Sequence, residues 1–467
     1  MRERPARLGA LPRIFGLRLI AVGLAVLLMG AGETRRPPIV QAAKSGDKAA
    51  LRALLQKGAD VNAADADGST ALLWASYSDE TESAGVLIRA GAKVNAATDL
   101  GVTPLWAASQ NGSAPMVRML LASGANPNAA LLHGETPLMV AARSGYTEVV
   151  NLLLARRADV NARGPRKQTA LMWAVAQKYP EVVKLLVAHG ADVHARTAAW
   201  NEVMAVPPHG YLPYNRAIPH GSDTALMFAA RMGDLESAKL LVDSGANVND
   251  RDAWGISATV LAAHSGFRDF VEYLLAKGAD PNASDAGFTV LHEAIMRRDE
   301  AMARALLEHG ADANAPLRTW TPTRRSSIDF HFEPVLVGAT PFWLAAHFNE
   351  PGIMRLLVKH GADPRFVHHS DYVATKGFEH HTDTTNALMA AVGMVGGEAW
   401  VKPPRPQREA LALETVKLAL ELGIPVNGVN AQGRTALDGA KALGYDSEVQ
   451  YLAAQGARPG KQLQSNR

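Results

Sequence analysis

The stretch from His133 to Arg157 decides the fold: HGETPLMVAARSGYTEVVNLLLARR, which continues as Ala-Asp-Val-Asn over 158–161. Its parts recur in register along the chain: Thr-Pro-Leu, paired alanines, paired leucines, and a Gly-Ala-Asp exit or a variant of it. The first five copies of the exit start 33 residues apart, at Gly58, Gly91, Gly124, Arg157 and Gly190. Six more copies follow, at Gly245, Gly278, Gly310, Gly361, Gly423 and Gly456. A fixed period of this length predicts stacked supersecondary units that share one continuous core.

Each position of the repeat has a physical role. The hydroxyl of Thr136 is suited to cap a helix, and Pro137 then occupies the first helical position, where its missing N–H is not needed. Val149, Leu152 and Leu153 follow i, i+3, i+4 spacing and form one apolar face of a second helix. We therefore expect about eleven units, each a helix pair, with short hairpins between successive units.

In these motifs the chain resembles the ankyrin repeat family. The resemblance rests on Thr-Pro-Leu at 103–105 and 136–138 and on Gly-Ala-Asp-Val-Asn-Ala at 58–63, in many registered copies, and it covers roughly residues 39–458. It implies an all-α fold, a curved ankyrin-repeat α-solenoid of stacked helix pairs with short β-hairpin fingers. It also implies a non-catalytic scaffold that binds a protein or peptide partner on its concave face.

Departures from the period indicate insertions. The step between exits lengthens to 55 residues from Gly190 to Gly245, to 51 from Gly310 to Gly361, and to 62 from Gly361 to Gly423. We place the extra residues in hairpin fingers, apart from a last stretch between the two helices of unit ten. The insertions lie near 197–220, 316–337, 365–383 and 395–410, and the last contains Pro403-Pro404-Arg405-Pro406, which predicts a stiff extended loop.

The insertions are rich in the residue types that dominate protein interfaces. Trp, Tyr and Arg are enriched in interface hot spots, and loops inserted in repeats often form the binding face. The partner-binding candidates in the insertions are Trp200, Tyr211, Tyr214, Trp320, Arg324, Phe330, Phe332, Tyr372 and Phe378. The alternating apolar residues of 328–332 also predict an extended strand. The alternative, that these aromatic side chains fold back onto the array, stays open.

A second set of candidates lies on the first helix of each unit. The residues after the paired alanines tend to face partners in the ankyrin family, which adds Arg143, Arg231, His264 and His347 to the partner-binding candidates. Large residues just after the Thr-x-Leu entry are interpreted as core between repeats: Trp74, Trp106, Trp173, Phe228, Trp343, Met139, Met172, Met227 and Met389.

Composition excludes several kinds of chemistry. The chain has no cysteine, so disulfides, thiolate metal sites and cysteine nucleophiles are excluded. The net charge of +3 arises in residues 1–32, where five arginines oppose Glu3 alone, so the charge gives no argument for nucleic acid. No nucleophile elbow, phosphate loop or dinucleotide fingerprint is present. We expect a monomer with no enzymatic activity and no cofactor.

One histidine-rich insertion supports alternative functions. His368-His369 and His380-His381 lie in the insertion 365–383 with carboxylates nearby, and imidazole with carboxylate suits borderline metals. Adjacent histidines often point apart, so we interpret these residues as a polar loop and predict no metal site. A small-molecule or metal-binding accessory protein of an envelope enzyme, or a secreted effector, stays as the alternative.

The N-terminus has the pattern of a bacterial-type export signal. An arginine-rich start precedes an uncharged apolar run of 13 residues, Leu19 to Ala31. As a helix this run would rise ~20 Å, short of a bilayer core of ~30 Å. We predict a signal peptide at 1–32, a linker at 33–38, the repeat domain at 39–458, a disordered tail at 459–467, and a periplasmic or cell-envelope location. An uncleaved membrane anchor, or secretion, is the alternative.

Overall fold

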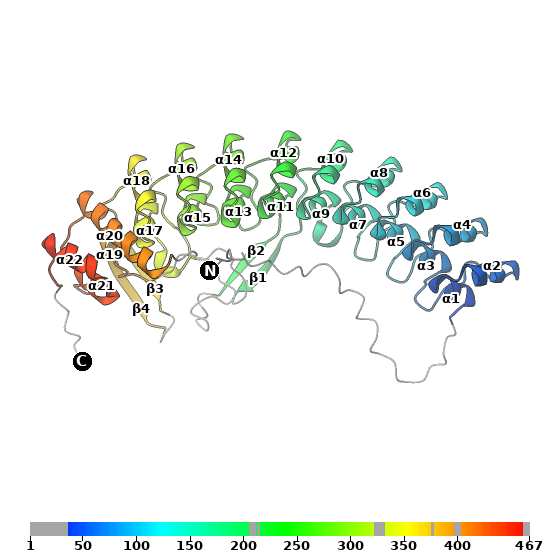
Figure 1. The fold of residues 1–467 in the computed structure, drawn as a ribbon, viewed down its shortest axis with the longest axis horizontal. Helices are drawn as coiled ribbons and strands as arrows, with labels where there is room; N and C mark the ends of the chain where they lie inside the picture. Colours follow the sequence, from blue (N-terminus) through cyan, green and yellow to red (C-terminus); the bar gives the residue numbers. More distant parts are fainter. Residues whose placement is uncertain are drawn as a thin grey trace, which may run out of the picture.

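The computed structural model describes residues 36–204, 212, 215–321, 332–374, 378–396 and 403–460. These ranges hold 22 α-helices in eleven consecutive pairs, the number of units that the repeat period predicts. Figure 1 shows the pairs in a curved row, with odd-numbered helices on the inner side and even-numbered helices on the outer side. The predicted all-α solenoid is confirmed. None of the helices in these ranges is long and apolar enough to cross a membrane.

Each unit contributes a short inner and a longer outer helix. The inner helices are α1 (Pro38–Lys44), α3 (Ala71–Tyr77), α5 (Pro104–Asn111), α7 (Pro137–Ser144), α9 (Ala170–Ala176), α11 (Ala225–Met232), α13 (Ala258–Ser265), α15 (Val290–Met296), α17 (Pro341–His347), α19 (Ala387–Ala391) and α21 (Ala436–Leu443). The outer helices are α2 (Lys48–Gln56), α4 (Thr81–Arg89), α6 (Ala114–Ala122), α8 (Thr147–Ala155), α10 (Pro180–Ala188), α12 (Leu235–Asp243), α14 (Arg268–Ala276), α16 (Glu300–Glu308), α18 (Pro351–Lys359), α20 (Arg405–Glu421) and α22 (Asp446–Ala454).

Two β-hairpins extend from the inner side of the row. β1 (Trp200–Met204) pairs antiparallel with β2 (Arg216–His220), and Trp200 lies opposite His220. β3 (Val367–Val373) pairs antiparallel with β4 (His380–Asn386), and Tyr372 lies opposite His381. The hairpins therefore occupy the insertions 197–220 and 365–383, as the lengthened steps predict. Single-turn 3₁₀ helices, η1 (Pro165–Lys167) and η3 (Pro334–Leu336), interrupt two other fingers.

The repeat motif forms these elements for local reasons. Thr136 has extended backbone torsions, and its side chain accepts a hydrogen bond from the backbone N–H of Met139 at 3.3 Å. Pro137 follows at the first helical position, and α7 ends at Gly145, whose φ of 75° is left-handed. The same entry recurs at Thr103, where the acceptor bonds the N–H of Trp106 at 3.2 Å. The predicted caps are confirmed.

The core runs continuously through the row, between neighbouring inner helices and between each inner helix and its outer partner. The paired alanines of α7 and the residues Val149 and Leu153 of α8 are buried. Trp106, Trp343 and the four methionines that follow a Thr-x-Leu or equivalent entry are buried too. Trp74, Trp173 and Phe228 are partly buried against the same core. The interpretation of these residues as inter-repeat core is confirmed.

An asparagine near the exit of eight of the described units joins each of them to the next unit. Asn161 is one example: its Nδ2 donates to the carbonyl oxygen of Gly190 at 3.0 Å, and its Oδ1 accepts from the N–H of Asp192 at 2.8 Å. We call this series the asparagine ladder; its members are Asn62, Asn95, Asn128, Asn161, Asn249, Asn282, Asn314 and Asn427. At the two remaining joints the equivalent residues are His194 and Arg365. Both joints carry a β-hairpin.

A bridging arginine spans the first interrupted joint. Arg196 donates to the carbonyl oxygens of Ser222 at 3.0 Å and Arg251 at 2.7 Å, and it pairs with Asp250 at 2.7 Å. These bonds link the exits of units five and six around the β1–β2 hairpin. The hairpin therefore enlarges one finger without separating the helix pairs behind it.

The structure corrects the expectation for residues 395–410. Among the described residues of this stretch, Arg405 already begins α20, which has 17 residues where the other outer helices have nine. Pro406 is tolerated because the N–H groups of a first helical turn have no partner within the helix. The prediction of an extended loop at 403–406 is wrong in its second half, since part of the insertion lengthens a helix.

Candidate functional site

The tips of the hairpin fingers lie side by side because their backbones are hydrogen-bonded. The N–H of Asp99 donates to the carbonyl of Asp67 at 3.0 Å, and that of Leu132 to Leu100 at 3.1 Å. Further along, the N–H of Ala198 donates to the carbonyl of Arg166 at 2.7 Å. Between these contacts, the fingers of Gly134 and Arg163 approach so closely that a Cβ on Gly134 would lie 3.0 Å from the carbonyl oxygen of Arg163. The fingers of units two to six therefore form one continuous surface.

Large apolar side chains are exposed on these tips. Leu100 is 66% exposed and Leu132 is 76% exposed, on fingers that touch each other. Trp200 and Val203 follow on β1, at 40% and 73% exposed. Apolar groups in this number at loop tips are unusual for a solvated turn and are typical of an interaction surface. We define the fingertip surface as Asp67, Asp99, Leu100, Leu132, Arg163, Arg166, Lys167, Trp200 and Val203.

Trp200, a sequence candidate, is held between two partners at the base of the first hairpin. Its ring stacks on that of His220 at 5.5 Å between centroids, and the guanidinium of Arg166 lies 4.7 Å from the Trp200 centroid. The side chain is fixed in place while part of it faces solvent, which suits an aromatic anchor for a partner. Tyr211 and Tyr214, predicted for the same hairpin, lie outside the described residues.

The second insertion packs onto the array where it is described. Phe332 is 1% exposed, and its ring lies 4.9 Å from that of Phe288 and 6.2 Å from that of His292. Its prediction as a partner-binding residue is therefore wrong, because the preceding unit supplies a buried socket for its ring. Trp320 is partly buried. Arg324, Phe330 and all of the strand predicted at 328–332 except Phe332 lie outside the described residues.

The third insertion presents a polar hairpin. Tyr372 is partly buried and stacks on His381 at 5.7 Å, and burial raises the pKa of its hydroxyl. Phe378 is exposed at the hairpin end. The structure thus leaves these two candidates at an accessible surface, on the last units of the row, well apart in sequence from the fingertip surface.

The four histidines of this hairpin do not converge. His368 is buried, its Nε2 lies 2.9 Å from the carbonyl oxygen of Val335, and burial lowers its pKa. The strand alternation and register place His369 and His380 on the opposite face of the hairpin, where His380 pairs with Asp371 at 2.6 Å. Among the described residues no group of three or more ligating side chains could hold a metal ion.

The four candidates on inner helices have local partners. Arg143 pairs with the buried carboxylate of Glu135 at 2.6 Å and lies over Trp173 at 5.3 Å, and Arg231 pairs with Asp223 at 2.9 Å. Both carboxylates directly precede the capping threonine of the same unit, so each arginine braces the base of its own finger.

The two histidine candidates are held more deeply. His264 lies 3.2 Å from the carboxylate of Glu293, and burial raises the pKa of that carboxyl. His347 is only 9% exposed and stacks on Trp343 at 5.3 Å, which contradicts its prediction as a partner contact. The large indole of Trp343, on the preceding turn of α17, covers the imidazole.

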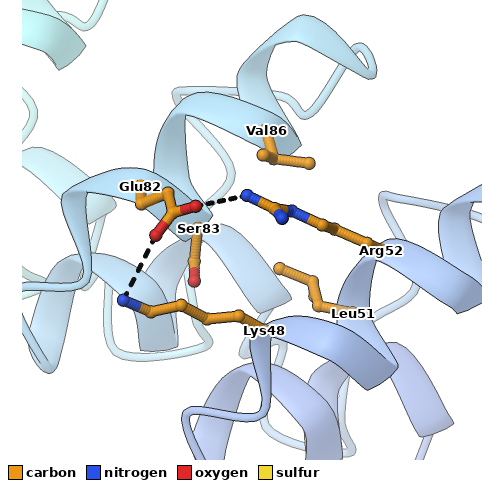
Figure 2. A pocket seen from close by; sticks show the side chains of 6 residues that line it. All are labelled: Lys48, Leu51, Arg52, Glu82, Ser83 and Val86. Carbon is orange, nitrogen blue, oxygen red and sulfur yellow. Dashed lines mark hydrogen bonds and ion pairs between the residues drawn. The ribbon is translucent and has the colours of Figure 1, made fainter.

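A surface hollow between α2 and α4 offers little to a ligand. Figure 2 shows Glu82 pointing toward both Lys48 and Arg52, and the Lys48–Glu82 pair measures 3.4 Å. Leu51, Ser83 and Val86 complete the lining, and the hollow encloses no space that would hold a water molecule. The accessible chemistry of the described chain lies on the extended fingertip surface and the hairpins.

Comparisons with known proteins identify the repeat. A family model described as ankyrin repeats (3 copies) matches residues 23–98, 39–131, 87–164, 105–197 and 226–316. Models described as ankyrin repeats (many copies) and ankyrin repeat match 171–242 and 337–369. Together these matches cover both halves of the chain.

Curated relatives share the repeats over part of their length. The chain is 28% identical over 254 residues to the E3 ubiquitin-protein ligase KEG of Arabidopsis thaliana, covering 50% of the chain and 15% of the relative. It is 32% identical over 166 residues to the putative ankyrin repeat protein FPV031 of fowlpox virus, covering 34% and 43%. The chain therefore spans less than half of the length of either relative.

A solved structure is also similar. The human ASB11 ankyrin repeat domain is 32% identical, and the match covers 53% of this chain and all of that chain with a TM-score of 0.43.

Proposed function

The chain belongs to the ankyrin repeat family, and from that premise we propose that it is a non-catalytic scaffold that binds a protein or peptide partner on its concave face and inserted fingers. Ankyrin repeats are generally protein–protein interaction modules. The fold is shared by proteins of many functions, so the support has to come from this chain's own surface. The carrying observation is the continuous row of fingertips, hydrogen-bonded or in close contact with one another, with exposed apolar side chains.

Size and rigidity support this proposal. Backbone hydrogen bonds join the fingertips of units two to four and of units five and six, and the fingers of units four and five lie in close contact, so little conformational entropy is lost when a partner docks. An extended surface of this kind matches another polypeptide better than a small molecule, which needs a concave pocket. The insertions add contact area at the joints of units five and six and of units nine and ten.

The test is affinity capture with a matched pair of variants. In the first, residues 201–219 are replaced by Asn-Gly, which keeps the buried base of the finger and removes the hairpin. In the second, Lys184→Glu and Arg89→Glu reverse two exposed charges on outer helices. We expect the first variant to lose the proteins that the parent chain captures and the second to retain them, with both melting cooperatively. Equal capture by all three proteins would refute the assignment.

We further propose that residues 1–32 direct export and that the repeat domain acts in the periplasm or cell envelope. The support is the arginine-rich start followed by the 13-residue apolar run from Leu19 to Ala31. Intact-mass measurement on protein from fractionated cells tests this proposal. A mature chain that begins near Gly32 in the soluble envelope fraction is expected. A full-length chain in the membrane fraction would favour an anchor, and a mature chain in the medium would favour secretion.

A further inference from the structure

We propose that the fingertip surface binds an acidic segment of a partner protein, about nine residues long, with apolar side chains at one end and a cluster of carboxylates at the other. This inference rests on the proposed scaffold function and specifies the partner's chemistry. It follows from the order of side chains along the surface, from the geometry of one fingertip, and from the spacing of the units.

The side chains of the fingertip surface change character in one direction. The tips of units two and three carry the exposed carboxylates Asp67 and Asp99. Leu100 and Leu132 follow on units three and four. The tip of unit five carries Arg163, Arg166 and Lys167, and Trp200 lies beyond it. The order is therefore acidic, apolar, basic and aromatic.

The basic end is available to a ligand. Within the described ranges neither Arg166 nor Lys167 forms an ion pair. The Arg163 guanidinium is engaged, since it donates to the carbonyl oxygens of Lys167 and Arg196, each at 3.3 Å, and lies 3.7 Å from the carboxylate of Asp192. The guanidinium of Arg166 lies over the ring of Trp200 at 4.7 Å from its centroid, and a guanidinium in such a contact keeps N–H groups for hydrogen bonds. Planar guanidinium groups recognise carboxylates through paired hydrogen bonds. The chemistry that complements this end is a run of Glu or Asp residues.

The backbone of this fingertip is held in an unfavourable conformation. Arg166 and Lys167 have φ of 53° and 59°, in the left-handed region that side chains other than glycine rarely adopt. Lys167 occupies the position that Gly68, Gly101 and Gly134 hold in the preceding fingers, two residues before the capping threonine. A glycine would relieve the strain, so the two basic side chains are retained at an energetic disadvantage. Such retained strain is typical of sites that serve function.

The acidic tips set the direction of the bound segment. Asp67 and Asp99 repel carboxylates, so the acidic part of a ligand is favoured over unit five and its apolar part over Leu100 and Leu132. Neighbouring helices pack about 8–10 Å apart, so the three steps from the tip of unit three to Trp200 span roughly 30 Å. An extended chain covers that distance with about nine residues at ~3.3 Å each.

The probes are three fluorescein-labelled nine-residue peptides. The first has two leucines near one end and three glutamates near the other, separated by serine and glycine. The second has the same composition with leucine and glutamate alternating. The third has glutamine in place of glutamate. Anisotropy titrations with the full chain are expected to give the tightest binding for the first peptide, by about 10-fold over the others, and weaker binding at higher salt.

The matched variants locate the site. Arg166→Glu with Lys167→Glu is expected to weaken binding of the first peptide at least about 10-fold, whereas Arg89→Glu with Lys184→Glu has the same net charge and is expected to leave it unchanged. Equal melting temperatures for the two double variants establish that folding is intact. If the basic fingertip pair proves necessary for folding, Trp200→Ala supplies the same test from the neighbouring finger.

Several results would overturn the inference. It is wrong if the first peptide does not bind, if the alternating peptide binds equally well, or if both double variants bind alike. Tighter binding of a single-stranded oligonucleotide of equal charge at Arg166 and Lys167 would also overturn it, in favour of nucleic acid. If a captured partner is lost on replacement of residues 201–219 but retained by Arg166→Glu with Lys167→Glu, the scaffold function stands and this inference falls.

Discussion

Replacing Asn161 by alanine tests whether the asparagine ladder holds the units together. The change removes two hydrogen bonds to the next unit, of 3.0 Å to the Gly190 carbonyl and 2.8 Å from the Asp192 N–H. A protein hydrogen bond contributes about 0.5–1.5 kcal/mol net, so two contribute about 1–3 kcal/mol. Water can reach the exposed groups that are released, which places the expected loss near 1 kcal/mol.

His194 supplies the matched control because it occupies the same position one unit later. Its exposed side chain makes no ladder bond to unit six. We expect His194→Ala to change the free energy of unfolding by less than about 0.5 kcal/mol. The reverse change, His194→Asn, is expected to stabilise the joint between units five and six by about 1 kcal/mol.

The assay is urea unfolding followed by far-UV circular dichroism, with amide hydrogen exchange as a local readout. Asn161→Ala is expected to lower the unfolding midpoint and to speed exchange of the Asp192 amide, which donates to Asn161. The reasoning fails if Asn161→Ala and His194→Ala shift the midpoint equally, or if the Asp192 amide exchanges at its original rate in Asn161→Ala.

Three further changes test buried groups. Arg298 and Glu350 form an ion pair in which each side chain is 13% exposed. Arg298→Ala is expected to lower the free energy of unfolding in urea by about 3 kcal/mol, the lower end of the range for a broken buried pair. The loss is at the lower end because burial already raises the pKa of Glu350 to about 7, so protonation of this carboxyl relieves part of it. A cost below about 0.5 kcal/mol would contradict a buried pair. Phe332→Ala is expected to cost about 3–5 kcal/mol, since it empties the socket beside Phe288; a neutral effect would return Phe332 to the partner-binding candidates. Burial, and next the charge of Glu409, raises the pKa of Glu448 to about 8, so this carboxyl stays protonated in the fold while the unfolded chain ionises near pH 4.5. Stability then falls as pH rises from about 4.5 to about 8, by an amount on the order of 4 kcal/mol. Glu448→Gln is expected to flatten this pH profile of the unfolding midpoint, and an unchanged profile would show that Glu448 is not its source.

The repeat could be predicted from sequence because its signals are local. Thr136 and Pro137 determine where one helix starts and Gly145 where it ends, through their own backbone preferences. Equivalent residues recur in other units. The insertions could be located because a fixed step makes any excess visible. The start of α20 is not predictable from the proline-rich stretch alone, because proline suits both an extended loop and the first turn of a helix, where Pro406 lies.

The fate of individual side chains in the insertions required tertiary information. Phe332 is buried by Phe288 and His292, which lie more than thirty residues earlier, and nothing within 316–337 indicates that socket. His347 is covered by Trp343 on its own helix, a contact that four-residue spacing could have suggested.

Single residues of the fingertip surface depart from the repeat pattern in the sequence. Leu100 and Leu132 stand at turn positions where polar residues are usual, and Lys167 stands where other fingers have glycine. What no sequence pattern shows is the backbone bonding between tips, such as Leu132 to Leu100, because any residue supplies those groups. The exposed apolar tips were thus detectable one by one, whereas their continuity was not.

His194 and Arg365 stand where the other joints have a ladder asparagine, so the joints between units are expected to differ in mechanical strength. Eight joints in the described chain carry an asparagine cross-link. Arg196 bridges the joint of units five and six instead, so in the described chain only the joint of units nine and ten, at Arg365, has neither kind of cross-link. Under tension applied at its ends, the array is expected to separate first at the joint of units nine and ten, and an optical trap would record the release of the last two units before that of the first nine. This joint also bears the β3–β4 hairpin, so a load on that hairpin would act where the array separates most readily.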